Sequence, residues 1–319
     1  MKVIIQIPCY NEEATLPETV RDLPAALDGV DAVEYLVVDD GSSDRTVEVA
    51  RSLGVHHIVR LKNRCGLALA FKAGIEACLE RGADIVVNTD GDNQYRGADI
   101  PKLIGPILRG EADIVIGERP IQDIPHFSPL KKFLQRKGSA VVGWLANMRV
   151  PDATSGFRAF TRQALLKLNL VSDYTYTLES IIYAGRKHIP VTSVRIGVNP
   201  MTRESRLIKN IISYMSLSVL TILRVWLNYA ALKISLLIAA ALIFLGLAIG
   251  ARFLYYFVTE GGAGHVQSLI LMAVLIFTGF QMVLIGFLAD LISGNKRLLE
   301  DISMRVKLLE QEHKKSSST

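Results

Sequence analysis

Two long stretches without charge near the C-terminus constrain this sequence more than any other feature. No charged residue occurs from Ile234 to Ala251, or from Val266 to Ala289. A helix needs about 20 apolar residues to cross the hydrocarbon core of a bilayer, and the first stretch reaches that length by continuing past Arg252. The sequence therefore predicts two transmembrane helices, at about 232–258 and 266–292, with a pair of buried core helices as the alternative.

The distribution of basic residues predicts how these helices are oriented. The connection Thr259–His265 contains no Lys or Arg, whereas basic residues precede the first helix and follow the second. By the positive-inside rule, both termini and the N-terminal domain are expected in the cytoplasm. The three cysteines lack the spacing of a zinc site or a disulfide framework, which suits a reducing compartment.

The net charge of +5 is expected to favour binding to anionic lipid headgroups and to phosphate-bearing substrates. No basic patch interleaved with aromatic residues occurs on a recognisable nucleic-acid module, so nucleic acid is not an expected partner.

The N-terminal part alternates short apolar runs with helical patterns, which predicts an α/β fold with a mostly parallel sheet. The predicted strands are Val3–Pro8, Tyr35–Asp39, His57–Leu61, Asp84–Thr89, Ile114–Gly117, Gly156–Phe160 and Val191–Val198. The predicted helices are Ala14–Leu27, Asp44–Leu53, Ala68–Arg81, Ile100–Arg109 and Leu130–Asn147. In such sheets ligands bind beyond the carboxyl ends of the strands, so polar residues directly after each run are the candidate site.

Carboxylates follow two of these runs. Asp90 and Asp92 come after one strand, and because residues i and i+2 of an extended chain point the same way, both carboxylates converge. Oxygen ligands of this kind suit Mg²⁺ or Mn²⁺ bound together with substrate phosphates, and Gln94 adds an oxygen nearby. Asp39 and Asp40 follow another strand, and adjacent carboxylates repel unless a partner such as a ribose hydroxyl or a base N–H lies between them.

With the segments Pro8–Glu13 and Asp152–Arg158, these motifs resemble the family 2 glycosyltransferases, specifically the dolichyl- and polyprenyl-phosphate sugar synthases. The resemblance runs from Val3 to about Lys209. The family includes members with two C-terminal transmembrane helices. The resemblance implies a GT-A fold and an inverting transfer of one sugar from a UDP- or GDP-sugar to a polyprenyl (dolichyl or undecaprenyl) phosphate. The segment Asn63–Ala68 departs from the family pattern, which leaves the contact of this loop with the donor open.

The resemblance also implies roles for individual residues. Those expected to hold the nucleotide sugar are Pro8, Tyr10, Glu12, Asp39, Asp40, Asp90, Gly91, Asp92 and Gln94, of which Asp90, Asp92 and Gln94 also hold the metal. Those expected to meet the phosphates of donor or acceptor are Arg119, Arg136, Ser139, Arg158 and Arg203. The residues expected to be catalytic are Asp92, Arg119 and Asp152.

The nature of the acceptor decides what Asp152 does. A phosphate monoester is already ionised at neutral pH and needs no general base, so alignment and charge stabilisation would carry the catalysis. A sugar hydroxyl of a lipid-linked glycan is the alternative acceptor, and it would require Asp152 as a base. A membrane scaffold that has lost catalysis is the alternative from a different class. Asp152 as a base, as a sugar contact and as an orienting group for an arginine all stay open at this point.

Four segments follow from these patterns. They are a transferase domain (1–205), an amphipathic helix in the membrane interface (206–231), two transmembrane helices (232–294) and a cytoplasmic tail helix (295–319). For the amphipathic helix, packing on the transferase domain is the alternative. Self-association through the transmembrane and tail helices is a hypothesis, because the apolar pattern of the tail is too short to establish a coiled coil.

Overall fold

The computed structural model describes residues 1–121, 129–168, 170, 176–200, 211–261 and 266–316. The chain divides into two compact units. The first comprises Met1–Ile222 with Lys307–Thr319, and the second comprises Leu223–Val306. Arg203 and the start of the predicted interfacial helix lie outside the described residues.

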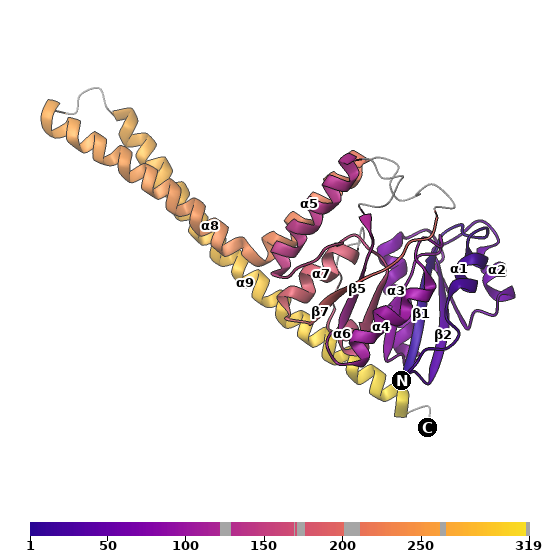
Figure 1. Cartoon of the computed structure of the whole chain (residues 1–319). Helices are drawn as coiled ribbons and strands as arrows, with labels where there is room; N and C mark the ends of the chain where they lie inside the picture. Colours follow the sequence, from indigo (N-terminus) through magenta and orange to yellow (C-terminus); the bar gives the residue numbers. More distant parts are fainter. Residues whose placement is uncertain (122–128, 169, 171–175, 201–210, 262–265, 317–319) are drawn as a thin grey trace. The chain divides into compact units, whose positions relative to one another are not determined.

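A seven-stranded sheet forms the centre of the first unit (Figure 1). In spatial order its strands are β3 (His57–Arg60), β2 (Ala32–Asp39), β1 (Lys2–Cys9), β4 (Ile85–Asn88), β6 (Arg158–Thr161), β5 (Ile114–Glu118) and β7 (Val191–Arg195). Only β6 is antiparallel to its neighbours among these strands. Every predicted strand overlaps an observed one, and the mostly parallel α/β fold is confirmed.

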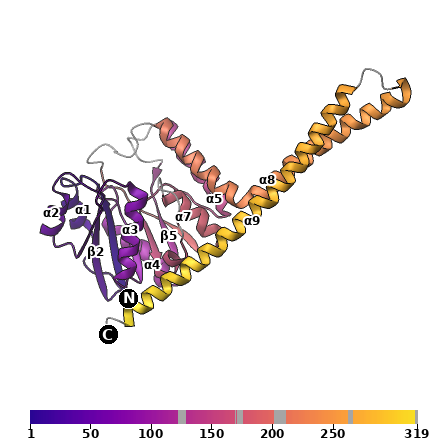
Figure 2. The ribbon, with the colours of Figure 1, turned by 180° about the vertical axis from the view of Figure 1, so that it is seen from behind.

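Helices cover both faces of this sheet (Figures 1 and 2). On the face where Val3, Ile5 and Ile7 are buried pack α1 (Leu16–Asp22), α2 (Thr46–Ser52) and α4 (Ile100–Leu108). On the other face pack α3 (Leu67–Glu80) and α7 (Tyr176–Arg186). A short 3₁₀ turn (Gly97–Asp99) precedes α4, and α6 (Arg162–Lys167) follows β6. Because both faces are covered, the central strands are buried on both sides and consist mostly of apolar residues.

A buried polar ladder crosses the face covered by α3. The Gln6 side-chain amide donates to Asn88 Oδ1 at 2.8 Å, and Asn88 Nδ2 donates to the Gly156 carbonyl at 2.8 Å and to the Tyr176 hydroxyl at 2.9 Å. Gly74 of α3 leaves room for this ladder, since a side chain there would clash with Gln6. The ladder therefore fixes the segment before β6 at the end of β4, beside Asp90.

Helix α5 (Pro129–Ala146) packs on α7. The two helices approach closely where Gly185 of α7 meets the main-chain carbonyl of Ala146, because a Cβ at Gly185 would clash with that oxygen. This contact positions α5, which carries Arg136 and Ser139.

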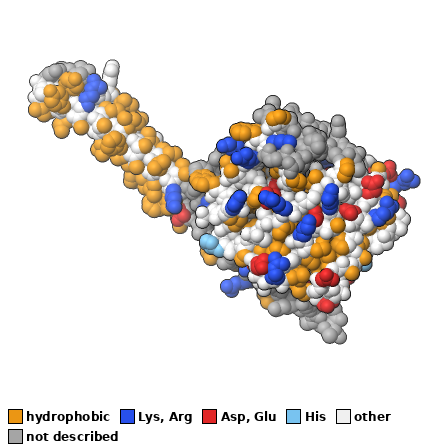
Figure 3. Space-filling view, viewed as in Figure 1, with side chains coloured by type: hydrophobic (Ala, Val, Ile, Leu, Met, Phe, Trp, Pro, Cys, Tyr) orange, Lys and Arg blue, Asp and Glu red, His pale blue; other side chains and the backbone are white. Residues whose placement is uncertain are grey.

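The second unit consists of parts of two long helices, α8 (Ile211–Glu260) and α9 (Val266–Ser316), whose outer ends belong to the first unit. The segments Leu232–Thr259 and Val266–Asn295 are long and apolar enough to cross a membrane, and only 17% and 11% of their most apolar windows is buried. Buried core helices would not expose such a surface, which Figure 3 shows as largely hydrophobic.

The helices are longer than the sequence pattern predicted. The segment 211–231 and the first span form one helix, and the tail to Ser316 continues the second span. The predicted boundaries followed changes in charge, whereas neither helix contains a proline to end it.

Glycines bring the two apolar helices together. Gly246 and Gly250 of α8 lie against Ile276 and Met272 of α9, and Gly279 of α9 lies against Ile243. Small residues allow this close approach in a bilayer, where helix association depends on packing rather than on the hydrophobic effect.

The contact at Gly185 predicts an asymmetric response to two glycine substitutions. We expect Gly185→Ala to destabilise the first unit by about 1–3 kcal/mol, because the new methyl group forces α5 away from α7. Gly138→Ala in α5 is the matched control, since no atom lies within 4 Å of a Cβ there. Thermal unfolding of the detergent-solubilised variants measures both effects, and equal midpoints would contradict the packing described.

Candidate active site

The ends of several strands meet at one edge of the sheet. The carboxyl ends of β1, β2, β4 and β5 lie there because these strands run in the same direction. Since β6 is antiparallel, its beginning lies at the same edge. The sheet thereby brings the motifs after β1, β2 and β4 together with Arg119 and with the segment that contains Asp152.

Hydrogen bonds join the loops that follow β1 and β2. Asn11 N donates to Ser42 Oγ at 2.9 Å, and Ser43 N donates back to Asn11 Oδ1 at 2.8 Å. Glu12 N donates to Thr46 Oγ1 at 2.9 Å. Asn11 adopts a φ of 55°, a left-handed conformation that asparagine tolerates better than most residues. Pro8, Tyr10 and Glu12 are consequently held beside the end of β2.

Asp39 presents an oxygen atom that lacks a hydrogen-bond donor. Its side chain is fully buried, and Oδ1 accepts the Ser42 N–H at 3.0 Å. Oδ2 has no hydrogen bond among the described residues, although Arg60 Nε lies 3.4 Å away as an ion-pair partner. A buried acceptor without a donor is costly, so this oxygen is suited to a ligand N–H or O–H group.

Asp40 is engaged by the protein itself. Its two oxygens accept the main-chain N–H groups of Cys65 at 2.6 Å and Gly66 at 2.9 Å, which fastens the loop before α3. The same loop places the Arg64 guanidinium 4.4 Å from the ring centre of Tyr10. The position of Asp40 therefore favours anchoring of this loop over the expected contact with the nucleotide sugar.

The Asp90–Asp92 segment is held from several sides. The Thr15 and Thr19 hydroxyls donate to the Gly91 carbonyl at 2.9 and 3.1 Å, and Gln94 N donates to Asp92 Oδ1 at 3.1 Å. Buried Glu12 accepts a hydrogen bond from Thr15 at 2.6 Å, so it supports the same segment. Both aspartates remain partly exposed at the sheet edge.

The carboxylate of Asp90 lies against a glycine. A Cβ at Gly156 would lie 3.1 Å from Asp90 Oδ1, so a larger residue would displace the carboxylate. Among the residues that the structure describes, no three His, Cys, Asp or Glu side chains cluster closely enough to hold a metal alone. Two carboxylates that leave the other positions to phosphate oxygens and water are the usual arrangement for Mg²⁺. The residues present thus fit a divalent cation bound together with a diphosphate.

A buried ion pair joins β5 to the segment before β6. Arg119 Nε donates to Asp152 Oδ2 at 2.7 Å, and Nη2 donates to Asp152 Oδ1 at 3.0 Å. Nη2 also donates to Thr154 Oγ1 at 2.8 Å, and the guanidinium carbon lies 6.0 Å from the ring centre of Tyr95. Asp152 is fully buried and Arg119 is 8% exposed. Nη1 makes no hydrogen bond within the described part of the chain, so it is suited to donate to a ligand.

The ion pair determines the protonation of Asp152. Burial alone would raise the pKa of Asp152, but the charge and hydrogen bonds of Arg119, with the Thr154 hydroxyl, hold that pKa below its ordinary value. A carboxylate with a lowered pKa and no exposed surface is a poor general base at neutral pH. Of the three roles left open for Asp152, its geometry favours the orientation of Arg119.

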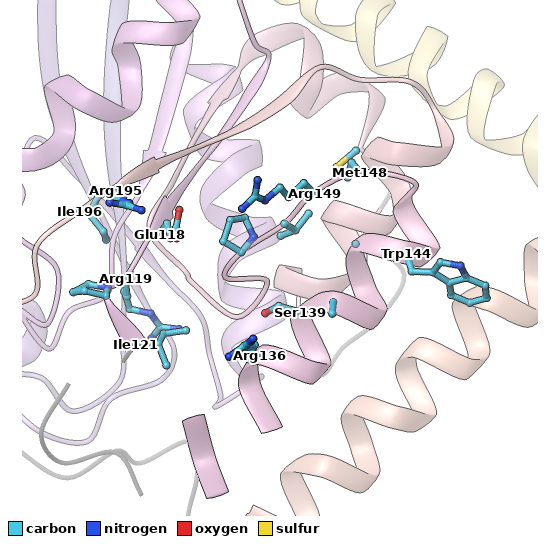
Figure 4. Close-up of a pocket in the computed structure, with 15 residues that line it drawn as sticks. Glu118, Arg119, Ile121, Arg136, Ser139, Trp144, Met148, Arg149, Arg195 and Ile196 are labelled. Atoms are coloured by element: carbon cyan, nitrogen blue, oxygen red, sulfur yellow. The ribbon is translucent and has the colours of Figure 1, made fainter. Parts of the chain in front are cut away.

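Arginines surround a cavity of about 670 Å³ next to this pair (Figure 4). Its lining includes Glu118, Arg119, Arg136, Ser139, Trp144, Arg149 and Arg195. Ser139 Oγ accepts the Ala153 N–H at 3.0 Å, which ties α5 to the segment that holds Asp152. Of the five residues predicted to meet phosphates, Arg119, Arg136 and Ser139 thus share one cavity, whereas Arg203 lies outside the described residues.

Arg158 does not reach this cavity. Its side chain is fully buried and donates to the carbonyls of Ala153, Ser155 and Thr177 at 2.8–2.9 Å and to the Ser180 hydroxyl at 2.7 Å. Burial lowers the pKa of Arg158 to about 10. The prediction that Arg158 meets a phosphate is corrected accordingly, because its donors hold α7 and the segment before β6 in place.

Two cavity arginines were not among the predicted site residues. Arg195 ends β7, so the rule of inspecting strand ends would have identified it. Arg149 follows α5 in a segment without a strand or helix pattern, and only the fold brings it to the cavity.

Comparison with known proteins agrees with this architecture. The family model described as "Glycosyl transferase family 2" matches residues 4–168. The chain is 31% identical over 203 residues to an undecaprenyl-phosphate mannosyltransferase of Micrococcus luteus, covering 62% of this chain and 79% of the relative. It is 28% identical to a UDP-N-acetylglucosamine–dolichyl-phosphate N-acetylglucosaminyltransferase of Methanococcus voltae, covering 61% and 84%.

A similar fold occurs in a solved structure. Glucosyl-3-phosphoglycerate synthase of Mycobacterium tuberculosis, crystallised with Mn²⁺, UDP-glucose and phosphoglyceric acid, superposes with a TM-score of 0.55 at 22% identity, covering 71% of this chain and 78% of the other. The GT-A fold expected from the sequence is therefore confirmed. Because the family model spans more than half of its residues, this chain belongs to the family 2 glycosyltransferases and is a glycosyltransferase.

Proposed function

We propose that this chain transfers one sugar from a UDP- or GDP-sugar to a polyprenyl phosphate, with inversion at the anomeric carbon. The position of Arg119 carries this proposal. It borders the arginine-lined cavity, and the negative charge of Asp90 is among the influences that raise the pKa of its guanidinium, so that Arg119 lies within electrostatic reach of the Asp90–Asp92 segment. The names of the relatives from M. luteus and M. voltae support a lipid phosphate as acceptor.

The donor would lie along the edge formed by Asp39 and Asp90. Asp39 Oδ2, which has no hydrogen bond among the described residues, would accept an N–H or O–H of the nucleoside, and Pro8 and Tyr10 lie at the neighbouring end of β1. Asp90 and Asp92, with Gln94 nearby, would hold Mg²⁺ or Mn²⁺, which as a Lewis acid would stabilise the charge on the departing diphosphate.

The acceptor phosphate would enter the cavity lined by Arg136, Arg149 and Arg195. Two anions have to approach each other for the reaction, and guanidinium groups offset their repulsion by donating to phosphate oxygens in pairs. One ionised phosphate oxygen attacks the anomeric carbon while the bond to the nucleoside diphosphate breaks. Arg119, fixed by Asp152, directs Nη1 toward the phosphates, so the chain supplies alignment and charge and no proton acceptor is needed.

The transmembrane hairpin fits an acceptor whose tail stays in the bilayer. An anchored enzyme searches a surface rather than a volume, which raises the effective concentration of a lipid substrate. The absence of Lys and Arg between the two spans supports a cytoplasmic position for the transferase domain and both termini.

Product analysis tests the proposed reaction. We expect the full-length chain with Mg²⁺ or Mn²⁺, a short polyprenyl phosphate and a panel of UDP- and GDP-sugars to give a lipid whose mass has increased by one sugar. A panel that yields no glycolipid, or sugar on a lipid-linked glycan supplied in its place, would contradict the proposal.

Substitution of Asp92 tests the site of the cation. We expect Asp92→Asn to reduce turnover by about 10²-fold, because the amide no longer offers an anionic oxygen to the cation. Titration with Mn²⁺ followed by electron paramagnetic resonance should show weakened binding in the same variant. Exposed Asp28 provides the matched control, because Asp28→Asn should leave turnover and Mn²⁺ affinity unchanged. An unchanged Mn²⁺ affinity in Asp92→Asn would show that Asp92 does not bind the cation.

The pH dependence of the reaction separates a general base at position 152 from a carboxylate that orients Arg119. Its lowered pKa keeps Asp152 ionised at least as far into the acidic range as an ordinary aspartate, so the decline of kcat/KM on acidification should follow the second ionisation of the acceptor phosphate, at about pH 6. We expect Asp152→Asn to lower the rate without moving that midpoint. If Asp152 were the base, the decline of kcat/KM at acidic pH would disappear in the Asp152→Asn variant.

The same ion pair predicts acid sensitivity of the fold. Because the folded-state pKa of Asp152 is lowered, its contribution to stability is present above the pKa of the unfolded carboxyl, about 4, and is lost as the pH falls through the folded-state value.

Arg119→Lys, which breaks the bidentate geometry around a buried carboxylate, should cost up to about 3–5 kcal/mol of stability. Chemical denaturation at neutral pH measures this loss, and an unchanged midpoint would contradict the importance of the pair.

A further inference from the structure

One face of α5 exposes large apolar side chains beside basic ones. Phe133, Val141 and Trp144 are 57%, 46% and 71% exposed, although the opposite side of the helix packs on α7. With the exposed Lys137 they recur at spacings of three or four residues, so they form one stripe along the helix. Trp144 turns away from the other residues labelled around the cavity (Figure 4).

The charge of α5 has a single sign. The helix carries Lys131, Lys132, Arg136 and Lys137 and no acidic residue. The Lys137 ammonium lies 5.7 Å from the ring centre of Phe133, so cation and aromatic ring belong to the same exposed surface. Exposed aromatic and aliphatic side chains among lysines and arginines are characteristic of helices that lie in the interface of an anionic bilayer.

We propose that the stripe Phe133–Lys137–Val141–Trp144 is a membrane contact of the transferase domain itself, separate from the transmembrane hairpin, and that it docks on anionic lipid headgroups. Phe133 and Trp144 enter the boundary between headgroups and acyl chains, and the basic side chains stay among the phosphates. Trp144 also borders the arginine-lined cavity, so docking opens this cavity toward the lipid surface.

Two other occupants of the stripe have to be distinguished from a bilayer. In a symmetric dimer formed through this face, the same basic helix would oppose itself, and like charges would repel. Burial by the 211–231 segment of the same chain would shield Trp144 from both lipid and water, and this possibility is an outcome of the test below.

Tryptophan fluorescence in a bilayer tests the proposal directly, because the sequence contains only Trp144 and Trp226. The Trp226→Phe chain in nanodiscs leaves Trp144 as the reporter. With acyl chains brominated near the headgroups in a mixture of phosphatidylcholine and phosphatidylglycerol, we expect Trp144 to lose about half its emission and to resist quenching by aqueous acrylamide.

A matched reporter lies on the other face of the sheet. Leu108 at the end of α4 is also an exposed apolar residue, at 37%. In the Trp144→Phe/Trp226→Phe background, Leu108→Trp should be quenched by acrylamide and not by brominated lipid. Trp144 quenched by acrylamide alone would place the stripe in water. Trp144 quenched by neither agent would place it under protein, and either result would overturn the proposal.

The lipid composition tests the electrostatic part separately from any catalytic assay. Lys137→Glu, or omission of phosphatidylglycerol, should reduce the quenching of Trp144 by brominated lipid, because each removes attraction between α5 and the bilayer. Quenching that stays the same after both changes would contradict recognition of anionic headgroups.

Discussion

The buried pair of Arg119 and Asp152 connects the parts of this molecule that have to act together. Its two hydrogen bonds, at 2.7 and 3.0 Å, tie the end of β5 to the segment before β6, and Thr154 extends the link to Gln135 of α5. Removing one partner would leave a buried charge uncompensated, which is far more costly than losing a surface ion pair. The pair therefore fixes the arginine rigidly, and a fixed guanidinium is what stabilisation of developing phosphate charge requires.

The topology of the sheet explains why this pair lies beside the acidic motifs. Six parallel strands bring their carboxyl ends to one edge, and the single antiparallel strand β6 brings its beginning there as well. The buried ladder from Gln6 through Asn88 then fixes Gly156 next to Asp90. The sheet edge that carries Asp39 and Asp90 and the arginine-lined cavity consequently lie close to one arginine, Arg119, although their residues are far apart in the sequence.

Much of this arrangement could be predicted from the sequence, because it follows from local pattern. Apolar runs located the strands, and the residues after them included Asp39, Asp90, Asp92 and Arg119. The roles of Asp40 and Arg158 could not be predicted, since each depends on main-chain partners elsewhere in the fold, such as Cys65 for Asp40 and Thr177 for Arg158. The continuity of α8 through residue 231 could not be predicted for a related reason: a change in charge marks where a helix meets water, and it does not end the helix.

A structure of the full-length chain in a bilayer with Mn²⁺, an unreactive nucleotide-sugar analogue and a short polyprenyl phosphate would test the central claim most directly. The quantity of interest is the position of Arg119 relative to Asp152 and to the two phosphate groups. We expect Arg119 to remain paired with Asp152 while its Nη1 lies about 2.7–2.9 Å from a phosphate oxygen. An Asp152 released from Arg119 and bonded to the attacking oxygen of the acceptor would contradict this expectation.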